Sequence, residues 1–275
     1  MTPSELAALS HSEQSEHLVH LLSEGCDKSY LALAVKCLES ELVENSAKVA
    51  LGEQLSKIGD PRLSSPSDDD YWVLVERKGV QLYIAKYMVT TAEWCEFLNS
   101  DAYGDDDHWC AAGLKWRNSS RPTWNDLASG EGAQVLTYAN QPVVGVSWYE
   151  AQAYARAHGA RLLESGERLL LVRGPEKRPY PWGDPFGRGN ANTHEESLKR
   201  PCAVGIYSRD SVPEGVYDLA GNVAEWTSTG FESKKAYHPG SWKQPSMAAW
   251  AKAIQLISPA ARSDELGFRL AKAPN

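Results

Sequence analysis

Apolar residues at helical spacing dominate the first sixty residues of the chain. Between about 4 and 58 they recur every three or four positions, which is typical of amphipathic helices with one buried face. The spacing predicts about three short helices, ended at Gly59-Asp60-Pro61 because proline disfavours helix in the residue before it. The predicted apolar stripe consists of Leu18, Leu21, Leu22, Leu31, Leu38 and Leu42.

A different pattern begins after residue 70. Residues 64–70 (SSPSDDD) form a polar linker, and beyond it short apolar runs alternate with Gly, Pro, Asn and Asp. Only two helices are predicted there, over roughly 91–99 and 148–158, the second with Ser147 as N-cap and Glu150 as its partner three residues later. A stretch with Trp109, Trp116 and Trp124 is predicted to be loop. We therefore expect an α-helical segment over 1–66 and a loop-rich domain over 71–275.

Charge and cysteine content exclude several classes of protein. The net charge of -8 comes from residues 1–70, which hold 13 acids and 5 bases, and the remainder is balanced. Without a basic face we expect no nucleic-acid partner, and without a long apolar run or signal pattern we expect no membrane association and a cytoplasmic location. Five cysteines without a CxxC favour reduced thiols, and they are Cys26, Cys37, Cys95, Cys110 and Cys202.

Common catalytic motifs are not found in the sequence. It has no Walker A loop, no HExxH and no EF-hand spacing. His17 and His20 lie three residues apart on a predicted helix, and an exposed helix face is favoured over a metal site because no third ligand is nearby.

A series of motifs occurs in order along residues 72–272. The longest is GVYDLAGNVAEW at 215–226, which follows QPVVGVSW at 141–148 and YPWG at 180–183 and precedes GSW at 240–242 and RSDELGFRL at 262–270. Together they resemble the formylglycine-generating enzyme family, also called the sulfatase-modifying factor domain. The resemblance implies an α+β, C-type-lectin-like fold rich in ordered loops. The small all-α segment before it resembles a HEAT-like lead-in of bacterial sensors.

The resemblance also defines two positions at which oxidases of the family hold copper(I) with cysteine. This sequence has Gln244 and Ala249 there. Because copper(I) prefers thiolate ligands, we expect no copper and no conversion of a peptide cysteine to formylglycine. Iron-dependent relatives use a histidine-rich helical domain, whose spacing His11, His17 and His20 do not reproduce.

Calcium is the metal that the resemblance predicts. It implies a site formed by the Glu225 carboxylate with Gly221, Asn222 and Val223, and a second site that begins at Asn192 with Glu196 as an acidic partner. The alternative is that Asn222 and Glu225 only hydrogen-bond the loop.

We hypothesise that the protein is a non-catalytic module that presents a groove to a peptide or protein. The predicted ligand-binding residues are Trp242, Lys243, Gln244, Met247 and Trp250, since aromatic residues and methionine are enriched in interface cores. Two alternatives stay open for function: an enzyme of the family with altered metal-dependent oxidative chemistry, and a variable protein of a diversity-generating retroelement. A third alternative buries Trp242 and Trp250 in the core.

Overall fold

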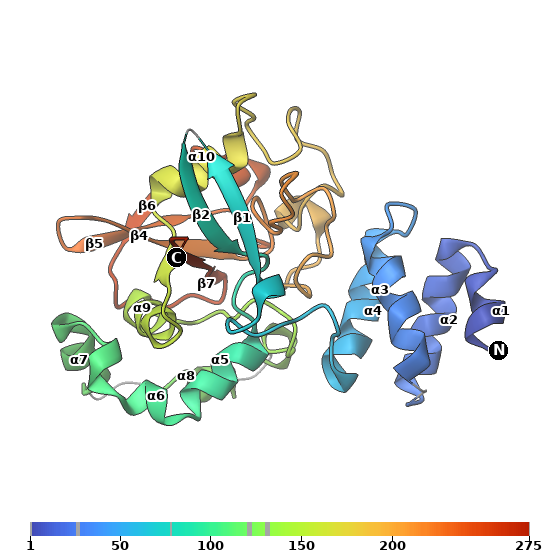
Figure 1. The fold of residues 1–275 in the computed structure, drawn as a ribbon, viewed down its shortest axis with the longest axis horizontal. Helices are drawn as coiled ribbons and strands as arrows, with labels where there is room; N and C mark the ends of the chain where they lie inside the picture. The colour runs from blue at the N-terminus through green and yellow to red at the C-terminus, as the bar shows by residue number, and fades with distance from the viewer. Residues whose placement is uncertain (1, 26–27, 78, 120–122, 130–132, 275) are drawn as a thin grey trace.

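The computed structural model describes residues 2–25, 28–77, 79–119, 123–129 and 133–274 (Figure 1). Cys26 lies outside the described residues, and the other four cysteines are free thiols. Within the described part of the chain no helix has the length and apolar character needed to cross a membrane.

The N-terminal helices, α1 to α4, cover residues 3–58 and confirm that this segment is helical. They are α1 (Pro3–Ala7), α2 (His11–Ser23), α3 (Leu31–Glu39) and α4 (Asn45–Ile58). Their apolar faces form one core that includes the fully buried Leu18, Leu38 and Leu55. The predicted stripe is wrong at Leu42, which is 75% exposed, because it lies in the turn between α3 and α4 and not on a helix face.

Helix α4 packs the N-terminal helices against the rest of the chain, at the right of Figure 1. Leu51 and Leu55 share a core with Cys202, Ala203, Ile206 and Tyr207. Polar contacts reinforce this packing: Asn45 Nδ2 donates to the Gly189 carbonyl at 2.8 Å, and Glu53 pairs with Arg200. Helix α4 ends at Ile58 and strand β1 begins at Trp72, so the predicted linker lies between them. The division into two domains stays a prediction.

The described residues between 72 and 274 form two four-stranded sheets, which confirms the α+β class. The first has the order β1-β2-β8-β3, all antiparallel, from β1 (Trp72–Arg77), β2 (Val80–Ala85), β8 (Leu270–Lys272) and β3 (Arg161–Leu162). The second has the order β6-β5-β4-β7, from β6 (Gln255–Ile257), β5 (Lys234–His238), β4 (Ala224–Phe231) and β7 (Leu266–Phe268). In this sheet β4 and β7 are parallel and the other pairs antiparallel.

The two predicted helices of this domain are confirmed as α5 (Thr91–Leu98) and α9 (Trp148–Ala157). Ser147 and Glu150 form the predicted capping box of α9. The expectation of only two helices is wrong, because α6 (Asp101–Gly104), α7 (Ala111–Arg117), α8 (Trp124–Ala128) and α10 (Ser165–Arg173) are also present. Three of these have seven residues or fewer, which is too short for an apolar period to be recognised in the sequence.

Short 3₁₀ turns connect many of these elements. They are Lys28–Tyr30, Asp69–Tyr71, Asp106–His108, Ala133–Leu136, His194–Glu196 and Ser246–Ala249. The Trp-rich stretch that was predicted as loop thus contains helices, and its buried Trp109 and Trp124 pack into the main aromatic core around Trp94, Tyr154 and Phe268.

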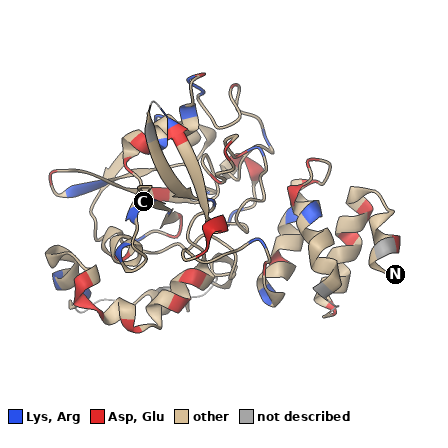
Figure 2. Ribbon diagram, in the orientation of Figure 1, with Lys and Arg blue, Asp and Glu red and all other residues tan. Residues whose placement is uncertain are grey.

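Basic and acidic residues are interspersed along the domain after residue 70 (Figure 2). This distribution agrees with the balanced charge of that part of the sequence. The absence of a nucleic-acid partner stays a prediction.

Candidate functional site

The segment 240–250 runs across the surface next to the loop 263–265. Gly240 is needed at its start, because a Cβ there would lie 2.1 Å from the Ala220 carbonyl oxygen. The half-buried Trp242 packs on the apolar cluster of Met88, Val144 and Val223. Its indole nitrogen donates to the Asp264 carbonyl at 3.3 Å.

Two acidic side chains of the 263–265 loop bind the residues after Trp242. Lys243 Nζ pairs with the Asp264 carboxylate at 2.9 and 3.0 Å. Gln244 Nε2 donates to both oxygens of Glu265 at 3.1 and 3.2 Å, and the Ser241 hydroxyl donates to Glu265 Oε2. The first three of the predicted ligand-binding residues are therefore held against one loop.

Met247 and Trp250 lie at the other end of the segment and face solvent. Met247 is 79% exposed and Trp250 is 45% exposed, and their backbones share a hydrogen bond of 3.4 Å. Ala249 between them is buried. The alternative that places Trp250 in the core is therefore wrong. Trp242 is half buried, because one side of it packs on the apolar cluster described above.

The same segment is tied to residues 193–196. The His194 N–H donates to the Gln244 carbonyl at 3.0 Å, and the Ser246 N–H donates to Glu195 Oε1 at 2.9 Å. Burial opposes ionisation of Glu195, but hydrogen bonds from Ser246 and from the Thr193 hydroxyl outweigh it and lower the Glu195 pKa to about 2. Glu195 is therefore an anion at neutral pH and fixes the 3₁₀ turn 246–249.

A cavity of about 240 Å³ is lined by Asp264, whose carbonyl accepts the Trp242 indole N–H. Its walls include Trp124, Val144, Gly145, Arg262 and Asp264. Trp124 is buried and its indole nitrogen donates to the Val144 carbonyl at 2.8 Å. The hollow therefore has a fixed aromatic wall and a charged rim.

The predicted calcium residues do not fit a calcium site in their present arrangement. Glu225 is buried, and its two carboxylate oxygens accept hydrogen bonds from Arg168 Nε at 2.9 Å and Arg269 Nε at 3.3 Å. Two guanidinium groups against one carboxylate would repel a divalent cation. Among the described residues there is no group of three or more His, Cys, Asp or Glu side chains that could hold a metal ion.

The amide side chains of both predicted calcium sites are used inside the loop as well. Asn222 Oδ1 accepts from the Cys202 N–H at 2.9 Å and from Asn192 Nδ2 at 3.2 Å. The Gly221 carbonyl accepts the Val223 N–H at 2.9 Å, and Glu196 Oε1 accepts the Gly189 N–H at 2.7 Å. These contacts agree with the alternative in which Asn222 and Glu225 hydrogen-bond the loop.

Two buried aspartates that sequence reasoning missed organise the 215–226 motif. The Asp210 carboxylate accepts the N–H groups of Leu219, Ala220 and Gly221 at 2.7 to 3.0 Å. Asp218 Oδ2 accepts the Gly205 N–H at 2.8 Å. Burial raises the pKa of Asp210 to about 7, with the nearby Asp218 as second cause, and burial raises that of Asp218 to about 6. Asp218 lies inside the 215–226 motif, so the motif could have drawn attention to it. Asp210 precedes the motif, and nothing in the sequence marked it.

Comparison with known proteins was consistent with this architecture. Residues 75–274 match the FGE-sulfatase family, described as "Sulfatase-modifying factor enzyme 1-like domain". Hercynine oxygenase of Mycolicibacterium thermoresistibile is 27% identical over 66% of this chain and 46% of its own length. The inactive C-alpha-formylglycine-generating enzyme 2 of Bos taurus is 29% identical over 58% of each chain.

The chain therefore spans about half the length of these two curated relatives. Among solved structures, PvdO from Pseudomonas aeruginosa superimposes with a TM-score of 0.52 at 22% identity, covering 70% of this chain and 81% of PvdO. This likeness confirms the expected C-type-lectin-like fold. Two hundred of the 275 residues match the family, and the chain thus belongs to the sulfatase-modifying factor, or FGE-sulfatase, family.

Proposed function

We propose that this protein is a binding module that receives a peptide or protein on the binding segment, defined as residues 242–250. The observation that carries the proposal is the exposure of Trp250 and Met247 on a segment that is otherwise fixed by hydrogen bonds. Large exposed apolar side chains on a rigid backbone are typical of interface anchors, since little conformational entropy is lost when they bind.

The chemistry at the copper positions supports a non-catalytic role. Gln244 offers an amide that is already bound to Glu265, and Ala249 offers a buried methyl group. Neither can act as a thiolate ligand. One relative in the family carries the word "inactive" in its name, in agreement with a scaffold that is kept after its oxidase activity is lost.

An enzyme with altered metal-dependent oxidative chemistry is the second candidate, and the similarity to a hercynine oxygenase favours it. The two candidates differ in what purified protein does with a cysteine peptide or a thiol and dioxygen. A binding module consumes no oxygen above the buffer control after loading with copper(I) or iron(II), whereas an oxidase does.

The narrower form of the proposal places the module in the bacterial cytoplasm, either in a signalling system or as the variable protein of a retroelement. The retroelement form requires a neighbouring reverse-transcriptase gene and a template repeat of the segment 240–268. Sequencing of the flanking DNA tests it.

Selection from a library of random peptides on the purified full-length chain tests the binding site. Trp250→Ala is expected to reduce the binding free energy of the selected peptides by about 2 kcal/mol, as for an interface anchor. Because the indole is 45% exposed, the variant should keep the melting temperature of the parent protein. Phe231→Ala is the matched control, since Phe231 is 65% exposed on a different element, the end of β4.

Two results would contradict the site. Equal peptide affinity of Trp250→Ala and the parent protein would move binding away from the segment. A loss of about 3 to 5 kcal/mol in unfolding free energy would mean that Trp250 acts as a core residue.

A further inference from the structure

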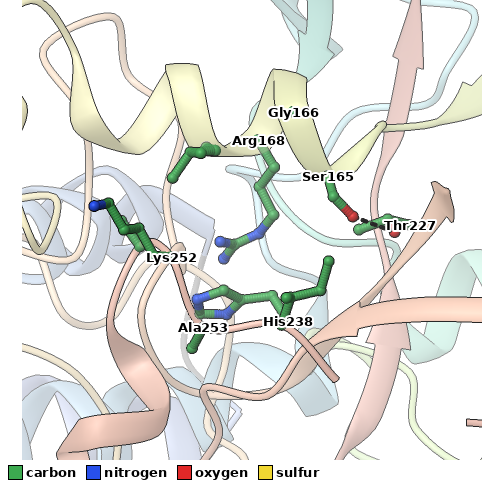
Figure 3. A pocket seen from close by; sticks show the side chains of 10 residues that line it. Ser165, Gly166, Arg168, Thr227, His238, Lys252 and Ala253 are labelled. Atoms are coloured by element: carbon green, nitrogen blue, oxygen red, sulfur yellow. Dashed lines mark hydrogen bonds between the residues drawn. The ribbon is translucent and has the colours of Figure 1, made fainter. Parts of the chain in front are cut away.

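A second cavity, of about 340 Å³, lies between α10 and the second sheet (Figure 3). The first turn of α10 forms one side with Ser165 and Arg168, and Thr227 of β4 and His238 of β5 form the other. The residues 251–254 close the third side before β6 begins. Its size is at the lower end of the range for small-molecule sites.

Arg168 presents a charged nitrogen to this cavity although its side chain is only 4% exposed. Nε donates to Glu225 and Nη2 donates to the Leu219 carbonyl. Nη1 has no hydrogen-bond partner among the described residues, and Figure 3 shows the guanidinium group directed toward His238 and Lys252. Water can reach Nη1 through the cavity, and a bound anion would replace that water with a charge-assisted hydrogen bond to the guanidinium group.

The charge balance behind Arg168 also favours an anion. Glu225 is shared with Arg269, so that one carboxylate serves two guanidinium groups. The other nitrogens of Arg269 donate to backbone carbonyls of 85, 86, 217 and 218. Of these three charged side chains, Arg168 is the one that lines the cavity.

The remaining polar side chains of the inner wall are already paired. His238 Nε2 contacts the Trp250 carbonyl at 3.0 Å, and Nδ1 accepts the Gly240 N–H at 3.3 Å, which assigns the proton to Nε2. Burial, and next the charge of Arg168, lowers the His238 pKa well below its ordinary value, so the ring is neutral. The Thr227 hydroxyl donates to the Ala236 carbonyl at 2.9 Å.

Apolar side chains form the rest of the wall. Leu169, Ala251, Ala253 and Ile254 line it, and Ile254 is 50% exposed at the edge. Lys252 is an exposed second cation among the lining residues. One buried guanidinium in an apolar hollow matches a ligand with one carboxylate on an apolar body.

We propose that this cavity binds a carboxylate attached to an apolar group, with Arg168 Nη1 as the donor to the carboxylate and Lys252 as a second positive charge. The ligand is either a free monocarboxylic acid or the C-terminal residue of a peptide, since both present the same chemistry. The cavity adjoins the binding segment, because residues 251–254 follow Trp250 and Lys252 Nζ lies 5.6 Å from the centre of the Trp250 ring. The two proposals depend on different side chains, so Trp250→Ala and Ala253→Phe test them separately.

Titration calorimetry on the full-length chain tests the proposal with hexanoate and benzoate as probes. Hexanamide and benzamide have the same shape without the charge. We expect the acids to bind about tenfold or more tightly than the amides, the factor of a charge-assisted hydrogen bond. A peptide that ends in leucine, as free acid and as amide, forms the second arm.

Variants locate the binding. Ala253→Phe fills the cavity and leaves the Arg168–Glu225 pair intact, so it should abolish acid binding while the melting temperature is kept. Lys252→Gln should weaken the acids severalfold, and Lys57→Gln on α4 is the matched control, expected to have no effect. Arg168→Met removes the donor directly and should also abolish acid binding. If Arg168→Met does not fold, Ala253→Phe still tests the proposal.

The arms also separate the two sources of ligand. A peptide acid that binds about tenfold more tightly than hexanoate identifies a C-terminus as the ligand, and equal affinities identify the free acid. Equal binding of acids and amides, retained binding in Ala253→Phe, or no binding of any probe up to about 10 mM would overturn the proposal.

Discussion

Single acidic residues in the 205–225 region differ in function according to their partners. Glu225 has the position of a predicted calcium ligand, but its carboxylate is bound by Arg168 and Arg269. Asp210 and Asp218 are as deeply buried and accept backbone N–H groups instead. Because the surroundings are so different, these acidic residues lead to separate predictions: one about metal dependence at Glu225 and one about pH dependence at Asp218.

Removal of Glu225 should destabilise the fold whether or not calcium is present. Glu225→Ala leaves two buried guanidinium groups without their carboxylate, which costs about 3 to 5 kcal/mol. Urea unfolding with calcium and with a chelator should show the same loss in both solutions. A loss that appears only with calcium would instead support the calcium site that the sequence predicts.

Asp218 should make the protein less stable as pH rises. Its pKa is raised from 3.8 to about 6 in the folded state, so the folded chain retains a proton that the unfolded chain releases. The stability that this proton contributes is complete below pH 3.8 and is lost as pH rises through about 6. Asp218→Asn should therefore reduce the fall in unfolding free energy between about pH 4 and 7.

This substitution is structurally conservative. Asp218 has a φ of 55°, which asparagine tolerates, and Asn Oδ1 can still accept the Gly205 N–H. Unfolding free energies of the parent and the variant at several pH values give the slope. An unchanged slope would show that Asp218 is ionised throughout this range.

Helix caps contribute at the scale of elements. The Ser147 hydroxyl donates to Glu150 Oε2 at 2.7 Å and accepts the Glu150 N–H at 3.3 Å, and both residues are fully buried. Ser147→Ala should lower the unfolding free energy by about 1 to 2 kcal/mol, because a buried acceptor and a helix N–H each lose a partner. The same box at Ser10 and Glu13 on α2 is exposed, so Ser10→Ala is the control and should cost less.

At the scale of the whole molecule, Gly52 controls how closely α4 packs on the rest of the chain. A Cβ at this position would lie 2.9 Å from Ala203 Cβ. Gly52→Ala favours the isolated helix by about 1 kcal/mol but opposes this contact, and we expect the contact to dominate with a loss of about 1 to 3 kcal/mol.

Hydrogen exchange measures this effect directly. In Gly52→Ala the amides of α1 to α4 should exchange faster while those of β4 and β7 keep their protection. Gly104→Ala on α6 meets no atom within 4 Å and is the control. Unchanged exchange of α1 to α4 would mean that the interface accommodates a methyl group.

Local patterns were sufficient to predict much of the fold. The helices at 91–98 and 148–157 were predicted, the second with its capping box, because such local patterns involve residues only three or four positions apart. The capping box of the first helix, Thr90 with Glu93, was recognised only in the structure. Helices α6, α7 and α8 were missed because each is too short to show a period. The order of the motifs predicted the family and with it the α+β, C-type-lectin-like class.

The sequence by itself thus determined the helical N-terminal segment, the family and the absence of cysteine at positions 244 and 249, since each depends on residue identity or on neighbours along the chain. The tertiary structure decided which charges meet: Glu225 contacts Arg168 and Arg269, which lie 57 and 44 positions away. It also decided that Trp250 is exposed and that Arg168 lines a cavity. Burial and pairing of charges depend on the distances between residues from different elements, and only the packing of those elements fixes such distances.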